Sequence, residues 1–170
     1  QKQMLTWAVE THNGPVAIRY PRGTEGSYQA SDWNGLEGEL VKCHRTGKDV
    51  TLITYGNLLD NVLEAAEILA ASGVEATVLR LLTVSDLAPE EVLKKLSENP
   101  VVIVAEEVCS GSGIRESLAW QLHELAPGCR FAGMDLGKAF VPHGSLKELH
   151  RHCGLDAAAI ANYTKDVLSR

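Results

Sequence analysis

Long hydrophobic runs are absent from this sequence. No stretch approaches the roughly 20 apolar residues that a helix needs to cross a bilayer, and the chain does not open with a basic segment followed by an apolar one, as a signal peptide does. We therefore expect a soluble, cytoplasmic protein that has no membrane partner.

Cysteine is scarce and scattered. The four cysteines are far apart and none forms a C-x-x-C pair, which argues against a disulfide scaffold. We expect reduced thiols at Cys43, Cys109, Cys129 and Cys153.

An excess of positive charge is also missing. The formal net charge is −6, whereas nucleic acids and anionic membranes select basic surfaces. This balance predicts no nucleic-acid partner, and it requires that any bound phosphate meet a local cation.

What the sequence does contain begins with a helical pattern at its front. Apolar residues recur between Met4 and Val9 before Gly14 and Pro15 end the pattern, and the first residue is not methionine. We expect this chain to be a fragment that starts inside a helix of a longer polypeptide.

A regular alternation of strands and helices occupies residues 39–170. Strand patterns and helix patterns follow one another, and the run "VVIVAEE" is apolar enough to be covered on both faces. This order predicts an α/β fold, a mostly parallel sheet with helices on both faces. The strands are expected at 39–45, 50–56, 74–82, 101–107 and 129–136, and the helices at 57–73, from Pro89, at 114–125 and from Leu146.

The helix expected at 57–73 has a clear apolar face. Leu58, Val62, Ala66 and Leu69 recur at helical spacing, while Asn57 is placed to cap the helix and Gly73 to end it.

Two features near Glu106 resemble sites without the spacing of one. The turn at 108–113 lies between a strand and a helix, where backbone amides can hold phosphate, but it lacks the full G-x-G-x-x-G spacing and is read as a plain turn. Glu106 and Glu107 are adjacent on a strand, so their side chains point to opposite faces, which disfavours a shared two-carboxylate site.

The stretch at 143–153 invites a metal interpretation. It contains His143, His150, His152 and Cys153, but His150 and His152 diverge on a helix, so the spacing favours surface histidines over a metal site.

Two arginines lie at the exit of the apolar run "PVAIRY". In a strand, Val16, Ile18 and Tyr20 would share one face and Arg19 would lie on the other. Pro21 stops strand pairing and leaves Arg22 on the loop, where its planar guanidinium can bind a phosphate or a carboxylate. A surface or interdomain ion pair is the alternative role for Arg22.

Together, "RYPRG", "PHGS" and "GLDAAAI" carry a resemblance that covers nearly the whole chain. The sequence resembles the C-terminal part of thiamine-diphosphate-dependent enzymes of the transketolase superfamily, and is most similar to the 1-deoxy-D-xylulose-5-phosphate synthase family. That family condenses pyruvate with glyceraldehyde 3-phosphate, with loss of CO2, for isoprenoid and thiamine precursor biosynthesis.

The resemblance implies roles for particular parts. Residues 1–24 would end the pyrimidine-binding domain, 25–38 would be a linker, and 39–170 would be a transketolase C-terminal-like domain that contributes to homodimer packing. Arg22 would contact the phosphate of glyceraldehyde 3-phosphate. Arg19 is assigned no catalytic part.

The resemblance also implies what this chain lacks. The family's thiamine diphosphate and magnesium ligands and its catalytic residues lie in upstream segments, so the parent would need both cofactors while the fragment would bind neither and be inactive alone. Two alternatives stay open: the β subunit of a 2-oxoacid dehydrogenase, and a non-catalytic dimerisation or regulatory module.

Overall fold

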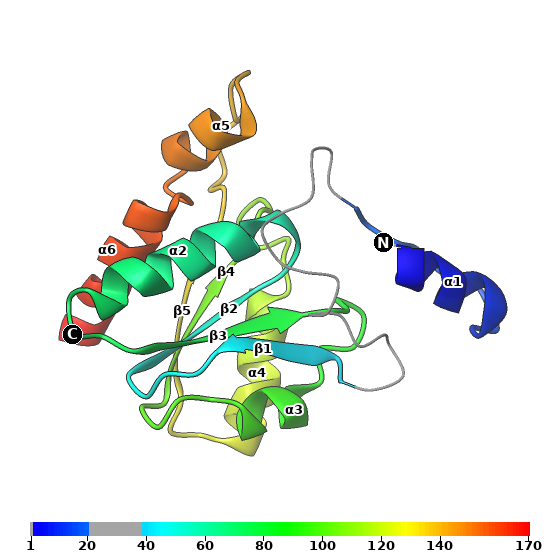
Figure 1. Ribbon diagram of the computed structural model, residues 1–170, viewed down its shortest axis with the longest axis horizontal. Helices are drawn as coiled ribbons and strands as arrows, with labels where there is room; N and C mark the ends of the chain where they lie inside the picture. The colour runs from blue at the N-terminus through cyan, green and yellow to red at the C-terminus, as the bar shows by residue number, and fades with distance from the viewer. Residues whose placement is uncertain (1, 21–38) are drawn as a thin grey trace.

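A computed structural model describes residues 2–20 and 39–170 of the chain (Figure 1). The side chains of residues 2 and 3 are outside this description. The expected linker at 25–38 and the candidate site residue Arg22 also lie outside the described residues.

Five strands form one sheet in the order β1-β3-β2-β4-β5. Strands β2, β3, β4 and β5 run parallel, and β1 pairs with β3 antiparallel. The mostly parallel sheet that the sequence predicts is thereby confirmed. The strands are β1 (Val41–Arg45), β2 (Val50–Thr54), β3 (Ala76–Leu81), β4 (Val101–Ala105) and β5 (Arg130–Met134).

Helices cover both faces of the sheet (Figure 1). One core lies between the sheet and helices α2 (Leu59–Ala70) and α6 (Ala157–Ser169), and a second lies between the opposite face and helices α3 (Pro89–Lys94) and α4 (Arg115–Leu125). All five residues of β4 are buried because both of its faces are covered.

Helix α2 packs with the face that its sequence predicts. Leu58, Val62, Ala66 and Leu69 are all fully buried, and Gly73 ends the helical segment at φ +83°. The expected cap at Asn57 is wrong. Asn57 lies inside a 3-10 turn (Gly56–Leu58), so Leu58 precedes α2 and contributes no side-chain cap.

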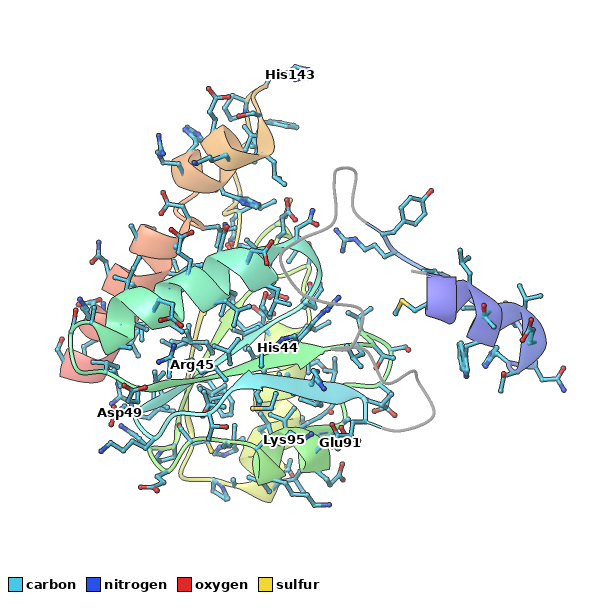
Figure 2. The ribbon with its side chains drawn as sticks, in the orientation of Figure 1. His44, Arg45, Asp49, Glu91, Lys95 and His143 are labelled. Carbon is cyan, nitrogen blue, oxygen red and sulfur yellow. The ribbon has the colours of Figure 1, made fainter. Side chains whose placement is uncertain are left out.

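The edge strand β1 is bonded along its outer side by side chains from the α3 region. The Glu91 carboxylate accepts the N–H groups of Leu40 at 3.0 Å and Val41 at 2.9 Å, and the Lys95 ammonium donates to the Val41 carbonyl at 2.9 Å. Figure 2 labels Glu91 and Lys95 together below β1. These contacts occupy backbone groups that an edge strand would otherwise expose to other chains.

The helical stretch expected from Leu146 is two helices, α5 (Leu146–His152) and α6. Gly154 separates them at φ +69°, and the Asp156 carboxylate then accepts the Ala159 N–H at the start of α6. Ser145 and Glu148 form a capping box at the start of α5. Helix α5 projects from the body of the domain (Figure 1).

The front of the chain forms helix α1 (Lys2–Glu10) but no strand at 15–20. The strand expected in "PVAIRY" is therefore wrong for this chain. Residues 15–20 pair with no strand in the described part of the molecule, and an unpaired strand cannot satisfy its backbone groups with ladder hydrogen bonds.

Among the described residues, no helix has the length and apolar character needed to cross a membrane.

Candidate functional site

The sheet changes direction of growth between β2 and β4. β3 lies on one side of β2, and β4 lies on the other side. The helix that follows β2, α2, covers one face of the sheet, and the helix that follows β4, α4, covers the opposite face. In open α/β sheets, ligands bind outside the carboxyl ends of the strands at such a switch point. Tyr55 follows β2 at this point, and Glu106 and Glu107 follow β4.

Glu106 lies buried beside this switch point. Glu106 is only 1% exposed. Its carboxylate accepts hydrogen bonds from the Tyr55 hydroxyl at 3.2 Å and from the Ile114 N–H at 2.9 Å. Gly113 makes room for it, because a Cβ at that position would lie 2.1 Å from the Glu106 carboxyl oxygen. The Ile114 N–H, at the start of α4, thus donates to the carboxylate of Glu106 within the same chain. This is expected for a plain turn rather than a phosphate-binding loop.

The same contact changes the acidity of Tyr55. Burial, the charge of Glu106 and the hydrogen bond to Glu106 raise the pKa of Tyr55 to about 12, with Arg19 opposing and Glu107 reinforcing the shift. The Tyr55 hydroxyl therefore stays protonated near neutral pH and acts as a donor to Glu106.

Glu107 points away from Glu106, toward α2 and α5. The Glu107 carboxylate lies 3.4 Å from Nε2 of His150, and Nδ1 of His150 lies 2.9 Å from the Asn61 amide nitrogen. The prediction that the two glutamates do not share a site is confirmed. The expectation of a surface histidine is wrong for His150, which is 6% exposed and is the one buried residue of α5.

A second polar cluster joins the end of β5 to the turn after β4. The Asp135 carboxylate accepts Ser110 Oγ at 2.6 Å, the Gly137 N–H at 2.8 Å and the Arg115 guanidinium at 2.9 Å. Burial alone would raise the pKa of Asp135, but these hydrogen bonds outweigh it and hold that pKa below its usual range.

Sequence reasoning missed this cluster. Asp135 directly follows the last parallel strand, just as Glu106 follows β4, so its place at the carboxyl edge was available from the strand pattern. Its pairing with Arg115 depends on β4 and β5 being neighbours in the sheet. The sequence pattern does not predict that strand order. Gly133 is needed for that pairing, because a Cβ there would lie 2.0 Å from Arg115 Cδ.

The histidine stretch does not gather into a metal site. His143 and His152 are exposed, and Figure 2 places His143 at the outer end of the projecting α5 segment. Within residues 2–20 and 39–170 there is no group of three or more His, Cys, Asp or Glu side chains that could hold a metal ion. All four cysteines are free thiols, as expected.

The arrangement is that of a structural edge rather than a catalytic centre. The carboxyl groups of Glu106 and Asp135 are each bonded to two or more donors that come from different segments of the chain. Such bonding fixes the loops around the switch point and leaves neither carboxyl group as a free acid or base.

Comparison with known proteins agrees with this fold. A structure titled "Split gene transketolase, inactive beta4 tetramer" superposes with a TM-score of 0.73 at 20% identity, over 86% of this chain and 47% of that chain. Transketolase from Campylobacter jejuni superposes with a TM-score of 0.54 at 18% identity, over 86% of this chain and 20% of that chain.

Sequence relatives are more similar. The 1-deoxy-D-xylulose-5-phosphate synthase of Magnetococcus marinus is 34% identical over 98% of this chain and 27% of its own length. The protein of the same name from Chlorobaculum tepidum is 32% identical over 94% of this chain and 25% of its own length. The chain thus spans about a quarter of the length of these relatives.

A family match settles the classification. Residues 39–160 match the family described as "Transketolase, C-terminal domain", and these residues include all five strands and the two polar clusters of the carboxyl edge. The chain therefore belongs to the transketolase C-terminal domain family.

Proposed function

We propose that this chain is the C-terminal part of a thiamine-diphosphate-dependent 1-deoxy-D-xylulose-5-phosphate synthase. The parent would be a cytoplasmic homodimer that condenses pyruvate with glyceraldehyde 3-phosphate, with loss of CO2, for isoprenoid and thiamine precursor synthesis. The observation that carries the proposal is the 34% identity to a synthase of that name over 98% of this chain, a span that includes the segment with Arg22.

Arg22 is the residue to which we assign substrate contact. Its guanidinium would bind the phosphate of glyceraldehyde 3-phosphate through two parallel hydrogen bonds, and Gly23 beside it would let the ligand approach the backbone. Residues 1–24 would belong to the pyrimidine-binding domain, 25–38 would link it, and 39–170 would form the C-terminal domain.

The C-terminal domain would contribute packing rather than chemistry. The described residues do not fit a magnesium–diphosphate site, because they hold no cluster of three candidate ligands and the Ile114 amide already serves Glu106. A matched structure of this fold is titled an inactive β4 tetramer of a split-gene transketolase, which supports the proposal that such a chain can be inactive. We accordingly propose that this chain alone is inactive and binds neither cofactor, which calorimetric binding in the micromolar range would contradict.

Kinetics of full-length Arg22→Ala test the function. The variant should raise the KM for glyceraldehyde 3-phosphate and spare the KM for pyruvate, because only the acceptor carries the phosphate. A charge-assisted hydrogen bond is worth roughly 1.5–3 kcal/mol, so kcat/KM should fall about tenfold to a hundredfold. Arg22→Lys should recover part of this loss, since the charge remains while the bidentate geometry is lost.

An acceptor aldehyde without the phosphate is the control. With that acceptor, wild type and Arg22→Ala should differ little. Equal damage with both acceptors would make Arg22 a structural residue and remove the basis for its assignment.

A further inference from the structure

The two outermost strands of the sheet differ in how their outer sides are covered. On β1, side chains of Glu91 and Lys95 bond the outer backbone groups. β5 is the last strand on the opposite side of the sheet (Figure 1), and it is exposed at its first residue and partly exposed at the others. Within residues 2–20 and 39–170, no strand or side chain bonds to the outer side of β5. In this part of the chain β5 is therefore the open side of the sheet.

The hydrogen bonds between β4 and β5 identify the groups that face outward. The Arg130 N–H and the Met134 carbonyl both bond to the β4 segment, so the even-numbered residues of β5 face β4. Backbone groups alternate in direction along a strand. The N–H and carbonyl groups of Phe131 and Gly133 consequently point away from the sheet.

The sequence of β5 contains few of the features that protect an exposed strand. Natural proteins block such strands with lysine, proline or a β-bulge. "RFAGM" contains no lysine and no proline, and it pairs with β4 in a regular register without a bulge. The small residues Ala132 and Gly133 also leave the outer backbone accessible. An open strand of this kind is a template for pairing with another strand.

We propose that the open side of β5 binds β5 of a second copy of this chain. The two strands pair antiparallel about a twofold axis at Ala132. Phe131 of one copy lies opposite Gly133 of the second, and these residues exchange both of their outward N–H···O hydrogen bonds. Ala132 faces Ala132 of the second copy, where two methyl groups allow close approach. A second copy fits because the same groups serve as donors and acceptors on both sides.

Exposed apolar residues beyond the two ends of β5 favour the same partner. Phe140, which is fully exposed, and Val141 follow the carboxyl end of the strand. Trp120 and Leu125 are 68% and 43% exposed and lie on α4, which leads into the amino end. Antiparallel pairing brings the carboxyl end of one β5 next to the amino end of the other. The two apolar groups then lie on the same side of the interface and add buried area to the backbone pairing.

The difference between the two outermost strands limits the assembly to two copies. Because Glu91 and Lys95 occupy the outer side of β1, only β5 is open to pairing, and pairing through one strand closes after one partner. The inference assigns a surface to the homodimer of the proposed function, and it rests on that part of the proposed function alone.

Sedimentation of the 170-residue chain at several concentrations tests the pairing. The wild type should form a dimer. Ala132→Lys and Ala132→Glu each place like charges at the twofold axis and should each weaken the dimer by at least about tenfold. An equimolar mixture of the two variants should restore it, since lysine then faces glutamate. Ala158→Lys, at an exposed position of α6 seven residues before Lys165, which contacts Ser72, is the matched control and should leave the dimer intact.

A variant outside the sheet gives a second readout. Phe140 is fully exposed, so Phe140→Ser should leave urea unfolding of the monomer unchanged and weaken the dimer by about threefold to tenfold. A wild type that stays monomeric, a dimer that resists Ala132→Lys, or a mixture of the two charged variants that stays monomeric would each overturn the pairing. The first result would leave β5 for another part of the parent to cover.

Sedimentation and kinetics separate this inference from the synthase assignment. A dimer with the expected response at Ala132, together with an Arg22→Ala variant that shows no selectivity for the phosphorylated acceptor, would retain the β5 surface and remove the role of Arg22. A selective Arg22→Ala variant together with a monomeric 170-residue chain would do the reverse.

Discussion

Two short apolar segments of this chain differ in secondary structure and in burial. Strand β2, "VTLIT", lies at the centre of the sheet with every residue buried, between β3 and β4. The segment "PVAIRY" at 15–20 forms no strand, and Val16 and Tyr20 are 39% and 66% exposed. The comparison shows that a β-prone sequence becomes a strand only where neighbouring strands and helices cover it.

Truncation of one core residue should give the largest difference between the two regions. Ile103 of β4 is 1% exposed, so Ile103→Ala should lower the free energy of unfolding by about 2–5 kcal/mol through lost burial and a residual cavity. Val16→Ala is the matched change outside the sheet and should stay within about 0.5 kcal/mol. Urea unfolding measures both, and equal losses would mean that residues 15–20 are part of the folded core.

Removal of Glu106 should cost somewhat less. Glu106→Ala leaves the Tyr55 hydroxyl and the Ile114 N–H without their buried acceptor, which should lower the free energy of unfolding by about 2–3 kcal/mol. Glu106→Gln keeps one acceptor oxygen and should lose less. If both variants unfold like wild type in urea, the carboxyl edge does not stabilise the domain through this residue.

Loss of Glu91 should leave the backbone of β1 less fully hydrogen-bonded, and in this respect more like residues 15–20. Glu91→Ala leaves the outer N–H groups of Leu40 and Val41 without their acceptor, at an expected cost of about 1–2 kcal/mol because the site is partly exposed. Hydrogen exchange should rise first in β1 and in the paired residues of β3, ahead of β4. Glu90→Ala, at an exposed acid of the same helix, is the control.

The sequence predicted elements whose determinants are local. The continuous apolar run of β4 and the helical spacing of Leu58, Val62, Ala66 and Leu69 each carry their own signal. The prediction that Asn57 caps the helix is wrong because a 3-10 turn precedes α2, which begins two residues later than the expected start at residue 57. Capping residues alone do not predict such a turn.

The polar contacts of the edge were harder to predict because they are non-local. His150 is buried by Asn61 and Glu107, which are 89 and 43 positions away in sequence. The sequence pattern of residues 143–153 does not indicate either partner. The hydrophobic periodicity likewise does not predict the strand order that brings Arg115 next to Asp135. Positions at the ends of parallel strands were predictable, whereas their partners required the sheet order.

The smallest predicted effect concerns Tyr55, which is half-buried and directly follows β2. Tyr55→Phe removes one hydrogen bond and should cost up to about 1 kcal/mol at neutral pH. Its distinguishing effect is on pH dependence. The pKa of Tyr55 is about 12 in the folded chain against 10.0 ordinarily, so the folded state retains this proton after the unfolded state has lost it.

It follows that Tyr55 contributes its proton-linked stability below pH 10, and that this stability is lost as the pH rises through about 12. Urea unfolding of wild type between these two pH values should show a steeper loss than Tyr55→Phe shows. Tyr163→Phe, on α6 and away from the edge, is the control and should follow wild type. Parallel curves for wild type and Tyr55→Phe would mean that Glu106 and burial do not hold this proton, and that Arg19 offsets them more strongly than the contacts of the edge imply.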